Sequence, residues 1–372
     1  MTTQSIISKS PSVSESLIRQ AAEHLQQGQL VCLPTETVYA VAALLSRPPA
    51  VSQLKQIKKI SGPPNWVIHL PDIASLKKIV AHPPGMALRV MKKLWPGPLA
   101  IEVPVSDADS RKLAAMIGPQ TAAECIANGF ITFRCPHSTA SLLVLNALGE
   151  PAVMIGAGDT SAVHEAADIP EAIRNASAMV LDTGPTRYRK PSTLIRIQGD
   201  QLTFLREGIL ARRIIERMTD HVILFICSGN TCRSPMAAGI AALRIGGKLG
   251  IPVNELPLRR IVVDSAGLYA NTGSPPAPEA VQAAADLGAD ISRHRSHTVT
   301  VDMLRRADLI FTMTSGHRTD VISLLPEAAV KTFNLDPDAD IADPIGAGQK
   351  QYNAVARRMN ELIKGRLAEI MS

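Results

Sequence analysis

Cysteine is scarce in this chain, and its spacing excludes two kinds of small-domain scaffold. Five cysteines occur among 372 residues, an odd number, and no two of them form a C-x-x-C pair. Disulfide frameworks need cysteines in pairs, and structural zinc sites usually take closely spaced ligands. We therefore expect neither a disulfide framework nor a metal site, and we interpret Cys32, Cys125 and Cys135 as apolar strand or helix residues.

Long apolar runs are also missing. No stretch reaches the ~20 apolar residues of a membrane-spanning helix, and residues 1–13 are polar and rich in serine, without the apolar core of a signal peptide. We therefore expect a cytoplasmic protein with no membrane partner.

Aromatic residues make up only 3% of the chain, which weakens the case for a nucleic-acid-binding surface. Single-stranded RNA is usually bound by stacking its bases on aromatic rings, and among the basic segments only Tyr188 offers such a ring. The basic segments that could line an RNA-binding face are Lys58, Lys59, Lys77, Lys78, Lys92, Lys93 and 187–190. We favour solvated helix faces and a loop as their interpretation and keep RNA as an alternative partner.

The length and apolar content indicate two domains. A chain of 372 residues is longer than one hydrophobic core usually supports, and an apolar fraction of 46% is enough for two cores. The formal net charge of +6 is a mild excess that permits a polyanionic partner without requiring one.

Hydrophobic periodicity predicts alternating strands and helices, and hence an α/β fold. The first helix is expected over 15–27, with Ser14 as its N-cap and Gly28 as its stop. Further strands are expected at 30–33, 67–70, 99–105, 131–135, 152–155, 179–181, 193–197 and 201–205. Further helices are expected at 50–60, 73–80, 86–94 and 139–148. The two domains are expected to join near 208–220.

A phosphate-binding loop with a nucleophile follows the apolar strand 222–226. The loop reads C-x-x-x-x-x-R-S and comprises Cys227, Ser228, Gly229, Asn230, Thr231, Cys232, Arg233 and Ser234. A helix begins near Ser234, with Pro235 in its first turn. A loop in this position turns backbone N–H groups and a helix N-terminus toward an anion.

The residue types in this loop suit phosphoryl transfer. N–H donors and a nearby arginine favour the thiolate of Cys227, which makes it a credible nucleophile. The planar fork of Arg233 can hold two phosphoryl oxygens, and Ser234 can donate to the departing thiolate. Asn230 tolerates a left-handed backbone and can tie the loop with its side chain.

From about residue 221 onward the sequence resembles the low-molecular-weight protein-tyrosine-phosphatase family. Besides the loop, the resemblance includes 264–267 (D-S-A-G), 292–296 (S-R-H-R-S), the apolar run 307–313 and 343–344 (D-P). It implies a doubly wound parallel sheet with helices on both faces, a phosphocysteine intermediate, no cofactor, and Asp343 as general acid. Asp336 also precedes a proline, but capping or solvated-loop duty fits it better than catalysis.

The resemblance implies a phosphorylated protein as substrate and leaves its phosphorylated side chain open. The loop is similar to that of bacterial protein-arginine phosphatases, although Ser228 replaces a threonine there. Tyrosine-directed members usually carry an aromatic residue after the Asp-Pro pair, where this chain has Ile345. Arsenate reduction would need a further cysteine, and none follows Cys232. In this family a second loop cysteine such as Cys232 can trap an oxidised nucleophile as a disulfide, or it can serve only in packing.

The first half resembles the YrdC-like threonylcarbamoyl-AMP synthase family. The shared segments are 34–39 (P-T-E-T-V-Y), 95–99 (W-P-G-P-L), 192–193 (S-T) and 205–208 (L-R-E-G). The resemblance implies a twisted α/β sheet and, for active members, ATP with Mg²⁺, threonine and bicarbonate as reactants for tRNA modification. It assigns tentative nucleotide or threonine contacts to Thr35, Thr37, Lys59, Arg134, Ser192 and Arg206.

Three positions depart from that family's pattern. Ser61 stands where the family has an arginine two positions after Lys59, 156–158 (G-A-G) replaces an S-x-N triplet, and Ala40 replaces a glycine. Each lost polar contact costs about 1–3 kcal/mol. We therefore favour a degenerate binding domain for nucleotide, threonine or RNA and keep a bifunctional enzyme as the alternative. The expected organisation is a polar tail at 1–13, a YrdC-like domain at 14–210, a linker at 211–220 and a phosphatase domain at 221–372.

Overall fold

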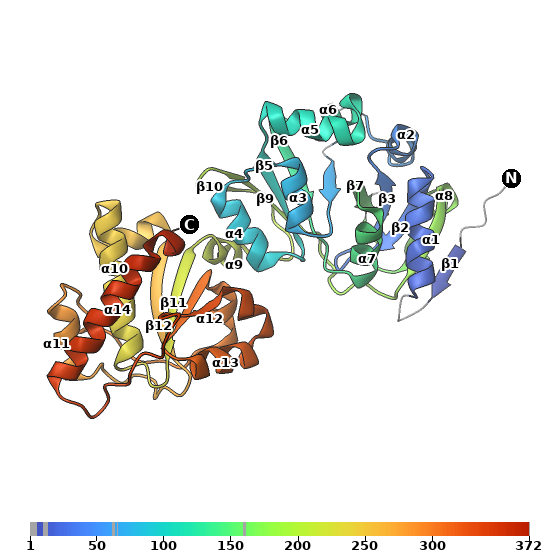
Figure 1. Ribbon diagram of the computed structural model, residues 1–372. Coiled ribbons are helices and arrows are strands. Elements are labelled where there is room, and N and C mark those ends of the chain that lie inside the picture. Colours follow the sequence, from blue (N-terminus) through green and yellow to red (C-terminus); the bar gives the residue numbers. More distant parts are fainter. Residues whose placement is uncertain (1–5, 10–13, 62–63, 65, 159–160, 372) are drawn as a thin grey trace. The chain divides into compact units, whose positions relative to one another are not determined.

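The computed structural model describes residues 6–9, 14–61, 64, 66–158 and 161–371. The chain divides into two compact units, residues 1–218 and 219–372 (Figure 1). Each unit is an α/β structure with its own sheet, as the sequence predicted.

The first unit contains a mixed sheet of ten strands in the order β1-β8-β2-β3-β7-β4-β6-β5-β9-β10. The strands are β1 (Ile6–Lys9), β2 (Leu30–Pro34), β3 (Tyr39–Leu44), β4 (Val67–His69), β5 (Leu99–Pro104), β6 (Phe130–Arg134), β7 (Ala152–Gly156), β8 (Ser177–Asp182), β9 (Thr193–Gln198) and β10 (Gln201–Arg206). The helices are α1 (Glu15–Gln26), α2 (Pro48–Ile57), α3 (Ile73–Ile79), α4 (Gly85–Leu94), α5 (Asp107–Ile117), α6 (Pro119–Cys125), α7 (Thr139–Leu148), α8 (Glu171–Ala176) and α9 (Arg212–Met218).

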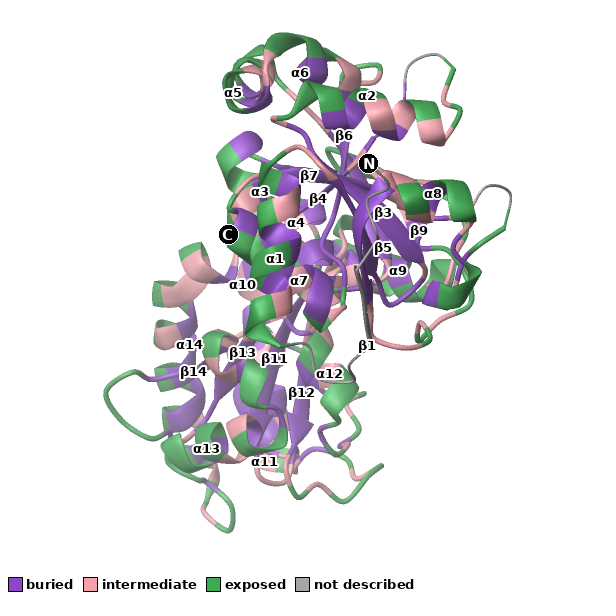
Figure 2. Ribbon diagram, turned by 90° about the vertical axis from the view of Figure 1, so that its right-hand side faces the viewer, coloured by how far each residue is buried: buried purple, intermediate pink, exposed green. Residues whose placement is uncertain are grey.

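Helices cover both faces of this sheet. The helices α1 and α7 pack on one face, where Leu25 and Val144 join the apolar side chains of β2, β3 and β8. The other helices pack on the opposite face, which Leu54 of α2 and Val90 of α4 help to fill. In Figure 2 central strands such as β3 and β5 are coloured as buried along most of their length, because both faces are covered there, whereas the edge strand β10 has no buried residue.

The ends of α1 confirm the predicted caps. Ser14 accepts a hydrogen bond from Leu17 N, and Gly28 follows the helix with a positive φ of 78°, a conformation that glycine adopts without strain.

The elements of this unit that differ from the expectations are β1, β3, α5, α6, α8 and α9. The strand β3 is buried at every position, so it lacks the alternation by which a half-exposed strand is recognised. The amphipathic helix α5 begins in a Ser106–Asp109 capping box, a start signal that is present in the sequence although no helix was expected there. The strand β1 pairs with β8 inside the expected polar tail, and α9 lies inside the expected linker.

The second unit contains a parallel sheet of four strands in the order β12-β11-β13-β14. The strands are β11 (His221–Cys227), β12 (Ile261–Gly267), β13 (Leu309–Thr312) and β14 (Thr332–Asn334). The helices are α10 (Arg233–Leu249), α11 (Pro278–Ala285), α12 (Val301–Arg306), α13 (Ser315–Leu324) and α14 (Gln349–Ile370), with 3₁₀ segments at Val253–Arg259 and Pro326–Lys331. The helices α10, α11 and α14 cover one face, while α12 and α13 cover the other. This confirms the doubly wound architecture.

The order of the strands places a ligand site at the end of β11. Both β12 and β13 pair with β11, so the chain winds in opposite directions on its two sides. In doubly wound folds, ligands bind beyond the carboxyl ends of the strands at such a switch point. The predicted phosphate loop begins there.

Among the described residues, no single helix is long and apolar enough to span a membrane. Only α10 together with the 3₁₀ segment Val253–Arg259, which is bent away from it, reaches that length and apolar content.

Candidate active sites

The predicted phosphate loop begins at the end of β11, and its first two carbonyl groups accept hydrogen bonds from residues outside the loop. Leu268 N donates to Cys227 O at 3.0 Å, and Tyr269 N donates to Ser228 O at 2.9 Å. These bonds come from the chain that follows β12. The two carbonyl oxygens, which would repel an anion, are thus engaged by backbone N–H donors outside the loop.

The sulfur of Cys227 sits among hydrogen-bond donors. Ser234 Oγ lies 3.0 Å from Sγ, and Asn230 N donates to Sγ at 3.3 Å. The helix α10 begins at Arg233, so its N-terminus adds partial positive charge close to the sulfur. Donors and positive charge of this kind favour a thiolate.

Asn230 ties the loop together, as its residue type predicted. Its φ of 55° is left-handed, and the residue is completely buried. Its Nδ2 donates to Ser234 Oγ and to Ser265 Oγ, both at 2.9 Å, while its Oδ1 accepts from His297 N at 3.0 Å. His294 Nε2 lies 2.8 Å from the carbonyl oxygen of Asn230 and supports the loop from a third direction.

Arg233 and Asp343 meet at the loop although 110 positions separate them. The Arg233 side chain is buried, its Nη1 donates to Ile341 O at 3.0 Å, and its Nη2 forms an ion pair with Asp343. The Asp343 side chain remains 43% exposed and accepts a hydrogen bond from Ile345 N. A carboxyl group with this access can reach a leaving group.

Asp336 does not have the capping or solvated-loop role that we expected. It is buried and forms an ion pair with Arg358 of α14 at 2.6 Å, rather than capping a helix or lying in a solvated loop. Burial alone would raise its pKa, but the bonds from Arg358 and Asp338 N outweigh this and lower it. Asp336 therefore holds α14 in place.

The remaining loop residues divide by their surroundings. Cys232 is buried, and its sulfur lies 3.3 Å from the hydroxyl of Tyr352. Ser228 lies 2.8 Å from Nε2 of His317 through its hydroxyl oxygen. Gly229 and Thr231 are partly exposed at the outer turn.

Sequence reasoning missed two residues beside the loop. Tyr269 is 73% exposed, and its hydroxyl donates to Asp320 at 3.2 Å, so an aromatic ring does stand beside the loop. Its position two residues after the D-S-A-G motif was the available signal. His317 lies 89 positions from Ser228, and no local pattern pointed to it.

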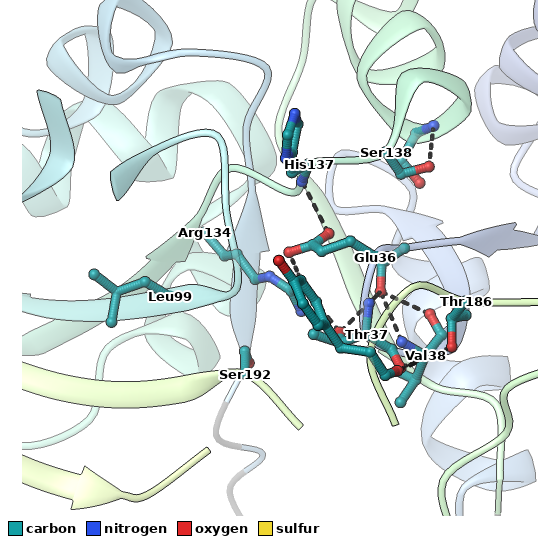
Figure 3. Close-up of polar contacts among 12 residues, drawn as sticks. Glu36, Thr37, Val38, Leu99, Arg134, His137, Ser138, Thr186 and Ser192 are labelled. Carbon is teal, nitrogen blue, oxygen red and sulfur yellow. Dashed lines mark hydrogen bonds and ion pairs between the residues drawn. The ribbon is translucent and has the colours of Figure 1, made fainter. Parts of the chain in front are cut away.

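A second polar cluster lies in the first unit at the ends of β2 and β6. Arg134 donates through Nη2 to Glu36 Oε1 at 2.7 Å and to Thr37 Oγ1 at 3.0 Å. The hydroxyl oxygens of Thr35 and Thr37 are 3.0 Å apart, and His137 N donates to the other oxygen of Glu36. Figure 3 shows Glu36 reaching both His137 and Arg134.

Ser192 and Arg206 form a neighbouring pair. Arg206 donates to Ser192 Oγ at 3.2 Å and to Ser192 O at 3.1 Å. Burial and, to a smaller extent, the charge of Arg134 lower the pKa of Arg206. Two partly buried arginines that repel one another electrostatically would be stabilised by a negatively charged ligand.

Lys59 makes no described hydrogen bond to the other residues for which a ligand contact is expected. It is exposed in the turn after α2, with a φ of 50°, and none of the described hydrogen bonds joins it to Arg134, Thr35 or Thr37. Within the G-A-G triplet, space requires glycine only at position 158, where a Cβ would stand 1.8 Å from Ser161 O, whereas a Cβ on Gly156 would meet only Val38 Cγ2 at 3.9 Å.

Among the described residues, no three His, Cys, Asp or Glu side chains gather closely enough to hold a metal ion. The carboxylate of Glu36, which belongs to the cluster, is engaged by Arg134 and His137 N.

The C-terminal fold and its cysteine loop define the class of cysteine-based phosphatases. Residues 222–372 match the low molecular weight phosphotyrosine protein phosphatase family, and residues 23–208, half of the chain, match the Sua5/YciO/YrdC family, described as telomere recombination. The chain belongs to both families, as a fusion of one domain of each.

Individual relatives agree for each half. A protein-arginine-phosphatase of Geobacillus stearothermophilus is 37% identical over 152 residues, which is 40% of this chain and 93% of that protein. A threonylcarbamoyl-AMP synthase of Bacillus subtilis is 29% identical over 55% of this chain, and the chain spans 57% of that relative. A solved Sua5 structure from P. abyssi has a TM-score of 0.50 at 23% identity over 65% of this chain and 76% of its own, which shows the fold alone.

Proposed function

We propose that the C-terminal unit removes phosphoryl groups from protein side chains through a phosphocysteine on Cys227. The observation that carries this proposal is the placement of the Cys227 sulfur among Ser234, Asn230 N and the N-terminus of α10, with Arg233 and Asp343 paired at the same loop. Nucleophile, oxyanion donors and proton donor are the three parts that such a reaction needs.

Each part has a defined step. The Cys227 thiolate attacks phosphorus, the S–P bond forms, and the bond from phosphorus to the leaving atom breaks while Asp343 gives that atom its proton. Arg233 holds two phosphoryl oxygens as the phosphorus inverts. Water then attacks phosphorus and gives Asp343 a proton, and inorganic phosphate leaves as Ser234 donates to the returning thiolate.

Among the possible side chains we favour phosphoarginine over phosphotyrosine. The G. stearothermophilus relative is named a protein-arginine-phosphatase. Asp343 and Asp320 place carboxylates near the loop that would attract a guanidinium leaving group, and Ile345, 70% exposed after the Asp-Pro pair, offers no ring. Tyr269 keeps phosphotyrosine in competition, because its exposed ring could stack on the substrate. Arsenate reduction has the least support, since no cysteine follows Cys232.

Matched peptides test both proposals at once. Peptides of one sequence would carry either phosphoarginine or phosphotyrosine, and phosphate release would be measured with the full chain and with Cys227→Ser. We expect faster release from phosphoarginine, and none with Cys227→Ser. Acid-quenched Asp343→Asn protein should show phosphorus bound to Cys227 by mass spectrometry. Substantial release by Cys227→Ser would refute the covalent mechanism.

For the N-terminal unit we propose ligand binding at the Arg134 cluster without efficient synthesis. Thr35, Thr37, Arg134, Ser192 and Arg206 support binding of a nucleotide or threonine. The isolation of Lys59, the serine at position 61 and the G-A-G triplet argue against full activity. RNA is the weaker candidate, because Tyr188 is the one aromatic residue among the basic segments and the guanidinium of Arg187 lies 5.1 Å from the centre of its ring, over one face.

Pyrophosphate release separates binding from synthesis. Cys227→Ser protein would receive ATP, threonine, bicarbonate and Mg²⁺, so that the phosphatase stays silent, and ATP binding would be measured by calorimetry in parallel. We expect binding that Arg134→Ala weakens, with little threonine-dependent release. Rapid threonine-dependent release would instead establish a bifunctional enzyme.

A further inference from the structure

Side chains clamp the phosphate loop from both strands that flank β11. On the β12 side, Asn230 bonds to Ser265, which lies in that strand. On the β13 side, Ser228 Oγ lies 2.8 Å from Nε2 of His317, which belongs to the first turns of α13. The second clamp has no counterpart in the motif, because His317 enters from a separate part of the chain.

The position of His317 is fixed before it reaches Ser228. Its backbone N donates to Oγ1 of Thr314, the N-cap of α13, at 3.1 Å, and the residue is only 7% exposed. A helix that begins at the carboxyl end of β13 delivers its first turns to the edge of the sheet where the loop lies. The imidazole therefore meets Ser228 in one orientation.

The surroundings of the ring decide which nitrogen carries the proton. The Nδ1 atom is buried and has no hydrogen-bond partner among the described residues. A proton on Nδ1 would be a buried donor without an acceptor, which is rare and costly in proteins. The proton therefore belongs on Nε2, which donates to Ser228 Oγ.

The charges that face His317 come from several elements. Arg233 approaches from α10, Asp340 and Asp343 from the chain between β14 and α14, and Asp320 from α13 itself. Burial and then the charge of Arg233 lower the pKa of His317 below its ordinary value of 6.5, although the three carboxylates oppose this. The ring is neutral at pH 7 as a result.

We propose that His317 is a positioning residue of the phosphatase site, whose neutral ring donates to Ser228 Oγ and so fixes the first turn of the phosphate loop. Because the Ser228 oxygen accepts a hydrogen bond from Nε2, its own proton remains available for donation. The acceptor would be an oxygen of the phosphate bound in the loop. The inference rests on the proposed phosphatase function. It adds a residue that acts through Ser228 and not on the substrate.

A double-mutant cycle on phosphate affinity tests the inference. The full chain would be titrated with inorganic phosphate by calorimetry, as wild type, His317→Ala, Ser228→Ala and the double variant. We expect His317→Ala to weaken phosphate binding about fivefold, the effect of one lost hydrogen bond, and Ser228→Ala to weaken it further, because that change also removes the hydroxyl that donates to phosphate. The double variant should be no weaker than the weaker single variant, because both changes remove the same bond.

Two further variants separate positioning from folding. His317→Gln keeps an N–H donor of similar reach without a ring, and we expect phosphate affinity within about twofold of wild type. Thr319→Ala lies on the same helix, where its hydroxyl donates to Ser315 O, and should leave both affinity and melting temperature unchanged. Independent effects of His317→Ala and Ser228→Ala, or no rescue by glutamine, would overturn the inference.

The proposed function can fail separately. Peptide turnover would be measured on the same proteins. If peptides are turned over through Cys227 while His317→Ala and Ser228→Ala affect phosphate affinity independently, the positioning role of His317 is refuted and the phosphatase proposal stands. If the effects of His317→Ala and Ser228→Ala on phosphate affinity are coupled but no peptide is turned over, the phosphatase proposal is refuted and the contact of His317 with Ser228 keeps its role in phosphate binding.

Discussion

Gly267, which lies outside the phosphate loop, should be one of its least replaceable neighbours. It ends β12 and pairs in register with Cys227. A Cβ built on it would stand 2.6 Å from Ser228 O, 2.8 Å from Ala270 Cβ and 3.0 Å from Asn230 N. Two of these three atoms are loop backbone, which cannot rotate out of the way. Gly267→Ala must therefore displace the loop.

The magnitude follows from that displacement. Ordinary van der Waals contact would push the Ser228 carbonyl back by roughly 1 Å. Overpacking of this kind costs about 1–3 kcal/mol of stability. A misplacement of about 1 Å in catalytic geometry can cost about 100-fold in rate, so kcat/KM should fall far more than stability does.

The matched control is Gly247→Ala in α10, where an added Cβ meets nothing within 4 Å. That change should stabilise the unit by about 0.5–1 kcal/mol, since alanine favours a helix interior. Urea unfolding and phosphate release from phosphopeptides would be measured for both variants. Full activity of Gly267→Ala in a folded chain would show that packing against Gly267 does not hold the loop in its working shape.

Three further outcomes are expected. Asp343→Asn should slow hydrolysis of an alkyl phosphate by about 100-fold or more and that of nitrophenyl phosphate much less, because only the poor leaving group needs a proton; equal slowing of both would exclude Asp343 as the acid. Glu36→Gln should destabilise the first unit by about 3 kcal/mol, because it leaves the buried Arg134 charge unpaired; a wild-type unfolding midpoint in urea would contradict this. Burial and then Arg134 lower the pKa of His69 to about 3, so the unfolded chain takes up a proton first as the pH falls below about 6.5. Stability of the first unit should therefore fall between pH 6.5 and 3, and His69→Asn should flatten this part of the melting profile; an unchanged slope would count against His69.

The phosphate loop could be predicted because its parts are contiguous. Strand, anion-binding turn and helix N-terminus lie within a few residues of Cys227, and each carries a local signal. The predicted roles of Cys227, Arg233 and Asn230 agree with one loop geometry. Asp343 came only with the family resemblance, because nothing local ties it to Arg233.

The first unit shows where local signals fail. The strand β3 went unpredicted because its sequence, Y-A-V-A-A-L, is half alanine, a residue depleted in strands, and its burial at every position leaves no alternation to offset this. Glu36, which no motif role had been given, pairs with Arg134, while the ligand contact expected of Lys59 stays a prediction. Side chains from β6 and the turn after β2 meet only when the ten strands take their order.

The sequence by itself determined the α/β class, the two-family composition and the chemistry of the loop, since these depend on residue types and short spacings. Only the tertiary structure decided the order of the strands, the pairing of Arg233 with Asp343, the burial of Asp336 and the contact of His317 with Ser228. The physical reason is distance along the chain. Each of these contacts depends on which strands lie side by side, and that choice is made by packing whole apolar faces rather than by any short segment.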